Sequence, residues 1–182
     1  MLYNQHLYIH GDNIAKPRHV GQIDPYCDVK KCVTMAYEEA ARLCDLHYGQ
    51  HPPLELWSSN KTSSEAEDVT IQFAYVPSHL HHMVFEVIKN SMRATVDHCK
   101  ETGKAELDPV KVLVSKTDVD ITIKISDLGG GIPRVNMTNL FKYMYTTAGR
   151  VGKAHAEVVK SSKVPPMAGL GYGLPLSRLY AR

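Results

Sequence analysis

A chain of 182 residues with a formal net charge of +2 is long enough for one compact domain, and its weak overall charge gives no reason to expect a nucleic-acid partner. Hydrophobic residues make up 43% and charged residues 22% of the chain, which is typical of globular proteins rather than disordered or fibrous ones. No run of about 18 apolar residues is present, and no transit peptide or other leader is evident after Met1, so we expect no membrane span.

Loops, one helix and two strands are predicted in the first half of the chain. Gly, Pro, Asn and Asp mark a loop over residues 11–25. Apolar residues at helical spacing predict an amphipathic helix over residues 28–48. Two segments with alternating apolar residues, 54–57 and 69–76, predict strands on either side of a polar loop.

The second half begins with the strongest helix signal, over residues 78–98, with Ser78 as the side-chain cap. Residues 110–115 and 119–126, the second with alternating apolar residues, predict a hairpin of two half-buried strands. A short helix over residues 136–145, a long loop over 146–168 and a helix resuming at Leu174 complete the pattern. This order predicts helices layered on one face of a mixed, largely antiparallel sheet, which is an α+β fold of the two-layer α/β sandwich type.

Cysteines and clustered histidines raise the question of disulfides and metal. The four cysteines form no C-x-x-C pair and are too sparse for a disulfide scaffold, so we interpret them as free thiols. Three histidines, at residues 79, 81 and 82, lack further ligands at the spacing of a zinc site, and we expect no structural zinc there.

Polar residues recur at three- and four-residue steps along the long predicted helix and share one stripe. At one turn from Glu86, His82 has the spacing at which an imidazole can hydrogen-bond a carboxylate, as a general base requires. One turn further on, Asn90 carries an amide oxygen that suits Mg²⁺. Taken alone, such a stripe is more often a solvated helix face. Its members are His82, Glu86, Lys89, Asn90, Arg93 and Asp97.

A glycine cluster follows the second strand of the predicted hairpin. Asp127 stands at the strand end, where a fixed carboxylate can accept a hydrogen bond from the exocyclic amino group of adenine. The glycines at residues 129–131 let the backbone approach a base closely and adopt positive φ. An ordinary glycine-rich turn explains the same residues equally well.

A second glycine-rich segment, residues 169–175, precedes the last predicted helix. Glycines before a helix start expose several backbone N–H groups beside the positive end of the helix dipole, which suits phosphate. Pro175 fits within the first helical turn, where no donor is lost. The glycine spacing differs from the Walker and dinucleotide-binding types, so this segment alone is a weak signal.

In this order, the three segments resemble the N, G1 and G2 boxes of the ATPase superfamily that contains Hsp90, DNA gyrase B, MutL and the histidine kinases. The chain is most similar to the pyruvate dehydrogenase kinases, in the stretches at residues 75–80, 89–95, 125–127, 143–148 and 171–182. The resemblance implies a Bergerat-type fold that binds ATP and Mg²⁺.

By the same resemblance, Glu86 is the base that takes the proton from a substrate serine, His82 adjusts it and Lys89 assists. Asn90 holds Mg²⁺ and Asp127 reads adenine. The remaining nucleotide-binding residues implied by the resemblance are Arg93, Gly129, Gly131, Thr146, Thr147, Gly169, Leu170, Gly171, Tyr172, Gly173 and Leu174.

The resemblance also carries expectations about the whole protein. Residues 1–25 are expected to be the remnant of an N-terminal helical bundle with a linker, and residues 26–182 the ATP-binding catalytic domain, truncated before its last strands. The implied reaction is phosphorylation of a serine on the α subunit of pyruvate dehydrogenase E1, which inactivates that enzyme. The lipoyl domain of E2 and a second copy of the chain are the implied partners, in the mitochondrial matrix.

Three alternatives stay open at this point. The branched-chain ketoacid dehydrogenase kinases share the glycine boxes. A non-catalytic, truncated nucleotide-binding module would keep the pocket without turnover. A bacterial-type histidine kinase core would require a phospho-accepting histidine on a separate helix, and no such helix is evident in the sequence.

Overall fold

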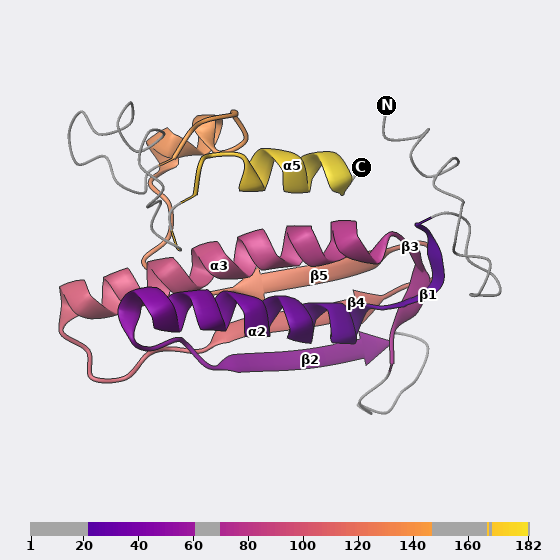
Figure 1. The fold of residues 1–182 in the computed structure, drawn as a ribbon, viewed down its shortest axis with the longest axis horizontal. Helices are drawn as coiled ribbons and strands as arrows, with labels where there is room; N and C mark the ends of the chain where they lie inside the picture. Colours follow the sequence, from indigo (N-terminus) through magenta and orange to yellow (C-terminus); the bar gives the residue numbers. More distant parts are fainter. Residues whose placement is uncertain (1–21, 61–69, 147–166, 168, 182) are drawn as a thin grey trace.

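Two long helices lie side by side over one face of a three-stranded sheet in a computed structural model of the chain (Figure 1). The structure describes residues 22–60, 70–146, 167 and 169–181. The helices are α2 (Val29–Tyr48) and α3 (Pro77–Thr102), and the shorter helix α5 (Gly173–Tyr180) packs on α3 on the side opposite α2. The predicted α+β sandwich is confirmed.

The sheet has the order β2-β4-β5 and is mixed. Strand β2 (Leu54–Asn60) runs parallel to β4 (Val110–Lys116), which pairs antiparallel with β5 (Ile121–Ser126). In β4 the alternation is complete: Val110, Val112 and Val114 are fully buried beneath the helices, whereas Lys111 and Leu113 face outward. Because side chains alternate between the two faces, a shift of one residue in the pairing of β4 would expose these valines.

The predicted hairpin forms, with a shorter second strand. Thr117 and Asp120 close the turn through a Thr117 N–H to Asp120 C=O bond of 2.8 Å and an Asp120 N–H to Thr117 Oγ1 bond of 3.0 Å. These bonds place Val119 inside the turn with 87% of its surface exposed, so its prediction as a strand residue was wrong. Its apolar side chain continued the alternation but has nothing to pack against.

A short strand that the sequence did not predict, β1 (Asp24–Asp28), pairs antiparallel with β3 (Gln72–Tyr75). The segment contains Pro25 and two aspartates, which are all poor strand formers, and only Cys27 is buried. Pairing with β3 outweighs those local preferences, and strand structure therefore reaches into the predicted loop at residues 11–25.

Local signals set both ends of α2. The Asp28 side chain accepts a hydrogen bond from the Lys31 N–H at 3.1 Å, and Gly49 ends the helix in the left-handed conformation with φ of 77°. These are the expected N-terminal and C-terminal capping residues of a helix. The predicted helix over residues 28–48 is confirmed to within one residue.

Helix α3 begins without a side-chain cap. Val76 is the capping residue and Pro77 occupies the first turn, so the prediction that Ser78 caps the helix was wrong. Proline at this position loses no hydrogen bond, because the first N–H groups of a helix have no intrahelical partner. The helix ends at Thr102, four residues later than predicted, and Gly103 caps it with φ of 66°.

Only a 3-10 helix, η2 (Arg134–Asn139), forms where a helix over residues 136–145 was predicted. No residue of η2 is buried, and Val135 and Met137 are 78% and 53% exposed. Short helices depend on an apolar face packed against a core, and this segment has none in the described part of the chain. Turns follow, and Met144 adopts a positive φ of 61°.

The core lies between the helices and the sheet. Val29 and Val33 from α2, Ile88 and Met92 from α3, and the inward valines of β4 have no exposed surface. All four cysteines are buried with free thiols, and the closest pair is Cys27 and Cys32, whose sulfur atoms are 3.9 Å apart. No helix in the described ranges has the length and apolar content needed to span a membrane.

Candidate functional site

Two glycine loops contact the same helix two turns apart. The first glycine loop, residues 127–131, follows β5, and the second, residues 169–173, leads into α5. The first loop contacts α3 at Ala94, and the second contacts it at Glu86. Eight residues of helix separate these contacts, which corresponds to about 12 Å along the helix axis.

Gly129 allows the first loop to approach α3 closely. A Cβ atom at this position would lie 2.5 Å from Ala94 Cβ and 2.9 Å from the backbone nitrogen of Thr95, so no other residue fits without a shift. The Gly129 N–H donates a 3.0 Å hydrogen bond to Asp127 Oδ1. This bond orients the carboxylate and occupies one of its two oxygens, which leaves Oδ2 able to accept from a ligand.

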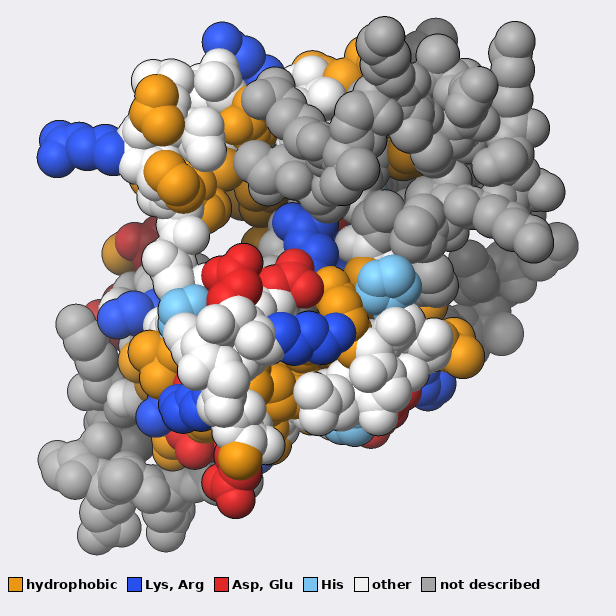
Figure 2. All heavy atoms as spheres, turned by 90° about the vertical axis from the view of Figure 1, so that its left-hand side faces the viewer, with side chains coloured by type: hydrophobic (Ala, Val, Ile, Leu, Met, Phe, Trp, Pro, Cys, Tyr) orange, Lys and Arg blue, Asp and Glu red, His pale blue; other side chains and the backbone are white. Residues whose placement is uncertain are grey.

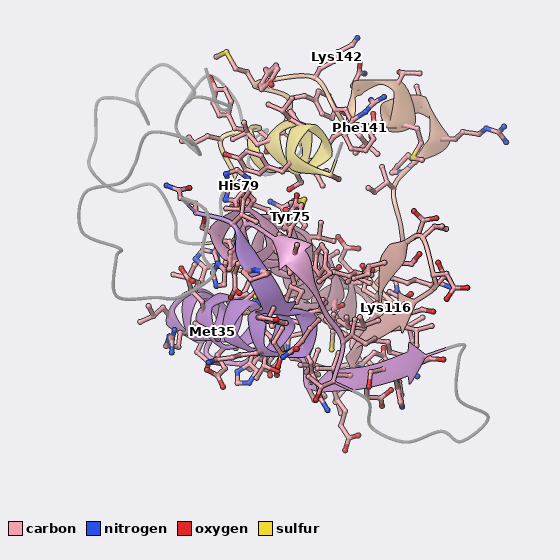
Figure 3. The ribbon with its side chains drawn as sticks, turned by 90° about the vertical axis from the view of Figure 1, so that its right-hand side faces the viewer. Met35, Tyr75, His79, Lys116, Phe141 and Lys142 are labelled. Atoms are coloured by element: carbon pink, nitrogen blue, oxygen red, sulfur yellow. The ribbon has the colours of Figure 1, made fainter. Side chains whose placement is uncertain are left out.

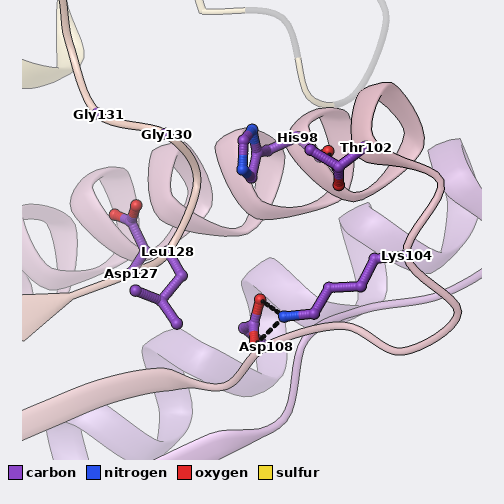
Figure 4. A pocket seen from close by; sticks show the side chains of 8 residues that line it. All are labelled: His98, Thr102, Lys104, Asp108, Asp127, Leu128, Gly130 and Gly131. Atoms are coloured by element: carbon purple, nitrogen blue, oxygen red, sulfur yellow. Dashed lines mark hydrogen bonds and ion pairs between the residues drawn. The ribbon is translucent and has the colours of Figure 1, made fainter.

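Asp127 and the first loop form one wall of an open cavity of about 640 Å³ (Figure 4). The other wall is the C-terminal end of α3 and the segment after it, where the Lys104 ammonium pairs with Asp108 Oδ2 at 2.6 Å. This wall was not predicted from the sequence, because the residues that form it have the pattern of an ordinary helix end. It consists of His98, Thr102, Lys104 and Asp108.

The cavity contains Asp127 and Gly131 but none of the residues predicted to be catalytic. Those residues lie further toward the N-terminus of α3, opposite the second glycine loop. The residues predicted to be catalytic therefore share helix α3. The cavity itself contains only residues that were predicted to lie near the adenine. In Figure 2, which faces the C-terminal ends of α2 and α3, acidic and basic side chains gather beneath a hollow in the middle of the molecule.

Glu86 lies against the start of α5. A Cβ atom on Gly173 would lie 2.8 Å from Glu86 Cδ and closer still to Oε2, so any larger residue at this position would push the Glu86 side chain aside. The other carboxylate oxygen, Oε1, pairs with the Lys89 ammonium at 2.7 Å. The Glu86 side chain is only 15% exposed and the Lys89 side chain 10%. Lys89 also lies 4.9 Å from the centre of the Phe85 ring. The ion pair and the glycine contact together fix the orientation of this carboxylate.

His82 does not make the predicted hydrogen bond to Glu86. Its Nε2 atom is buried and has no hydrogen-bond partner in the described part of the chain, and its ring stands edge-on to Tyr180 of α5 at 5.8 Å. Spacing of one helical turn permitted a bond to Glu86, but Lys89 occupies the carboxylate instead. Its neighbour His79 stacks on the same Tyr180 ring at 4.1 Å, beneath α5 (Figure 3).

Asn90 is half-buried one turn from Glu86 and one turn from Ala94, between the two glycine contacts. Its side chain makes no hydrogen bond to any residue the structure describes. A hard, neutral oxygen of this kind would suit Mg²⁺, which takes few protein ligands. Arg93 is half-buried on the same helix, whereas Asp97 points to α2, where it accepts a hydrogen bond from Tyr48 at 3.0 Å.

The second loop is braced by residues 143–145. Gly171, with φ of 77°, lies so close to this segment that a Cβ atom would be 2.6 Å from the Met144 carbonyl carbon. The Met144 N–H donates a 3.0 Å hydrogen bond to the Gly171 carbonyl, and the rings of Tyr143 and Tyr172 are 6.0 Å apart. These contacts place the second loop directly against residues 143–145.

The remaining predicted residues are less constrained. Gly169 and Leu174 are half-buried, and Leu170 and Tyr172 are 57% and 40% exposed at the surface of the second loop. Thr146 is half-buried and engaged in an interaction. Thr147 and most of the loop predicted over residues 146–168 lie outside the described residues.

Comparison with known proteins identifies a family and several relatives. Residues 75–182 match the family described as histidine kinase-, DNA gyrase B-, and HSP90-like ATPase. Over its whole length, the chain is 48% identical to a protein of Drosophila melanogaster named pyruvate dehydrogenase (acetyl-transferring) kinase, mitochondrial, and covers 42% of it. It is 46% identical to isozyme 1 of that kinase from Mus musculus and 48% identical to isozyme 3 from Homo sapiens, covering 40% and 43% of them.

The chain thus spans about two fifths of the length of the curated relatives it matches. The family match covers more than half of the chain and includes α3, both glycine loops and α5. The chain belongs to the family of histidine kinase-, DNA gyrase B- and HSP90-like ATPases.

Proposed function

We propose that this chain is the ATP-binding core of a protein-serine kinase that transfers the γ-phosphoryl group of ATP to the α subunit of pyruvate dehydrogenase E1 and thereby inactivates it. The observation that carries the proposal is the contact between Glu86 and Gly173, which puts an oriented carboxylate beside the loop suited to phosphate. The names of the similar proteins supply the substrate.

In this proposal the nucleotide lies along α3 between the two glycine loops. Asp127 Oδ2 accepts a hydrogen bond from the adenine amino group at one end, while Gly129 and Gly131 let the backbone approach the base. The N–H groups of residues 171–173 face the phosphates at the other end. Asn90, midway between them, would hold Mg²⁺, which offsets the charge of the phosphates.

Glu86 acts as the general base. Oε1 is held by Lys89 at 2.7 Å, which leaves Oε2, on the Gly173 side, to accept the proton of a substrate hydroxyl. A carboxylate whose rotation is restricted by an ion pair loses less orientational freedom when substrate binds. Lys89 therefore acts through Glu86, as a positioning residue.

Docking on the lipoyl domain of E2, assembly as a homodimer and residence in the mitochondrial matrix complete the proposal. They are properties of the whole protein. Support comes from the family resemblance and from the names of the relatives, which are mitochondrial pyruvate dehydrogenase kinases.

Two substitutions separate binding from transfer. Asp127→Ala is expected to abolish ATP binding, because the adenine amino group loses its acceptor, and Glu86→Gln is expected to retain binding and lose transfer. Calorimetric titration with ATP, with and without Mg²⁺, measures the first effect, and phosphate incorporation into purified E1 measures the second.

Glu101→Gln is the matched control, because this carboxylate is exposed near the C-terminal end of the same helix. Unchanged ATP affinity in Asp127→Ala would overturn the adenine assignment. ATP binding without transfer to E1 by the unsubstituted chain would instead favour a non-catalytic nucleotide-binding module, and transfer to the branched-chain enzyme would favour that substrate.

A further inference from the structure

The far wall of the cavity at the first glycine loop carries a polar side chain without a partner in the described part of the chain. The Lys104 ammonium donates to both carboxylate oxygens of Asp108, at 2.7 and 2.6 Å. The Thr102 hydroxyl donates to the His98 carbonyl of its own helix at 2.8 Å. The His98 imidazole, by contrast, makes no hydrogen bond, ion pair or ring contact with any residue that the structure describes. It is therefore the side chain of this wall that is available to a ligand.

Both ring nitrogens of His98 can be reached from outside the protein. Three side-chain N or O atoms in the described ranges are buried without a hydrogen-bond partner, and they belong to His82, Thr95 and Ser177. Neither nitrogen of the half-buried His98 is among them, so the protein encloses neither one. An accessible imidazole nitrogen can exchange water for a ligand, whereas an enclosed one cannot.

Contact with Gly130 sets the position of the His98 ring. A Cβ atom on Gly130 would lie 3.1 Å from His98 Nδ1, 3.5 Å from Cε1 and 3.7 Å from Cγ. Nδ1 is bonded to the other two atoms, so it is the corner nearest the loop, and Nε2 lies on the side of the ring away from Gly130. The imidazole thus reaches from α3 to the first glycine loop, across the cavity from Asp127 (Figure 4).

The two walls offer complementary hydrogen-bonding groups. At about 640 Å³ the cavity falls in the size range of small-ligand sites. The Asp127 carboxylate can only accept hydrogen bonds, whereas an imidazole also carries an N–H donor. In adenine, the exocyclic amino group is adjacent to ring nitrogens that accept hydrogen bonds. A base whose amino group is bound by Asp127 therefore presents an acceptor that Asp127 cannot serve and that His98 can.

We propose that His98 is a base-contacting residue of the nucleotide site and donates a hydrogen bond from Nε2 to a ring nitrogen of adenine bound at Asp127. Gly130 is part of this arrangement, because a side chain at that position would push against the imidazole. The inference rests on the proposed binding of ATP and is independent of transfer to E1.

Calorimetric titration with ATP tests the contact. His98→Phe keeps a ring but has no N–H, and we expect it to bind ATP about fivefold to tenfold more weakly, which corresponds to the loss of one hydrogen bond. His98→Gln keeps an N–H donor and is expected to stay within about twofold of the original affinity. Glu101→Gln, at an exposed position three residues further along α3, is the matched control and should bind ATP unchanged. Unchanged affinity in a folded His98→Phe variant, or equal losses in His98→Phe and His98→Gln, would overturn the inference.

A second measurement follows His98 directly, by ¹⁵N-edited NMR of the imidazole nitrogens. The His98 signals are assigned by their loss in His98→Gln, and we expect saturating ATP to shift the Nε2 signal of the unsubstituted chain. A His98 signal that stays in place while ATP is bound would refute the contact. ATP binding with shifted His98 signals but no transfer to E1 would count against the kinase function alone, whereas absence of ATP binding would overturn both proposals.

Discussion

Gly173 shows how much depends on a single missing Cβ atom. It allows the first turn of α5 to lie against the Glu86 carboxylate, whose second oxygen is held by Lys89. Gly129 does the same for the first glycine loop against Ala94. At both positions the requirement is close approach of backbone to a neighbouring element, whereas Gly49 and Gly103 meet nothing within 4 Å and serve only to end helices.

Gly173→Ala is therefore expected to displace the Glu86 carboxylate. A shift of about 1 Å in a catalytic group can lower the rate about 100-fold, so we expect a loss of transfer to E1 of that order. Measurement of phosphate incorporation under ATP saturation tests this. Gly49→Ala is the control, because it strains a positive φ at a site remote from the glycine loops and should change stability by about 1 kcal/mol without changing the rate.

Helices α2 and α3 are stabilised at their N-termini in different ways. α2 has a side-chain cap from Asp28, whereas α3 starts at Pro77 and has no side-chain cap. The first turn of α3 is instead held by tertiary contacts, since Tyr75 just before it donates a 2.6 Å hydrogen bond to the Tyr180 carbonyl of α5. Figure 3 shows Tyr75 and His79 beneath α5, with Phe141 on its other side.

Asp28→Ala is expected to lower the free energy of unfolding by about 1 kcal/mol, because the Lys31 N–H loses its acceptor. Urea unfolding followed by circular dichroism provides the measurement. Glu38→Ala, at an exposed position in the middle of α2, should change the free energy by less than about 0.5 kcal/mol. Equal effects from the two substitutions would show that the cap does not contribute.

For the whole molecule, the buried thiols make stability depend on pH in the alkaline range. Burial, reinforced by the neighbouring Cys32, raises the pKa of Cys27 from 9.0 to about 12, and burial raises that of Cys44 from 9.0 to about 11. In the unfolded chain both thiols ionise near pH 9, while the folded chain retains their protons. The stability they contribute is thus fully present below pH 9 and is lost as pH rises toward 12.

We therefore expect the free energy of unfolding to fall steadily with pH above 9. Urea midpoints measured from pH 7 to pH 10.5 test this expectation, and Cys27→Ala should give a shallower fall even though it lowers the midpoint at pH 7 by leaving a cavity. If the urea midpoint fell equally steeply with pH in the original chain and in Cys27→Ala, Cys27 would be excluded as a cause of the fall.

The sequence alone determined the features that depend on neighbours within a few residues: the helix over residues 28–48, the strand at residues 110–115, and the glycine-rich segments with the residues they contain. The tertiary structure decided what depends on distant partners. Strand β1 forms against its local propensity because β3 pairs with it. Residues 136–145 do not form the predicted α-helix, because no core in the described part of the chain receives them, and Glu86 pairs with Lys89 rather than His82. Local patterns report which conformations are permitted, but packing selects among them, because burial and pairing energies across the fold exceed the preferences of single residues.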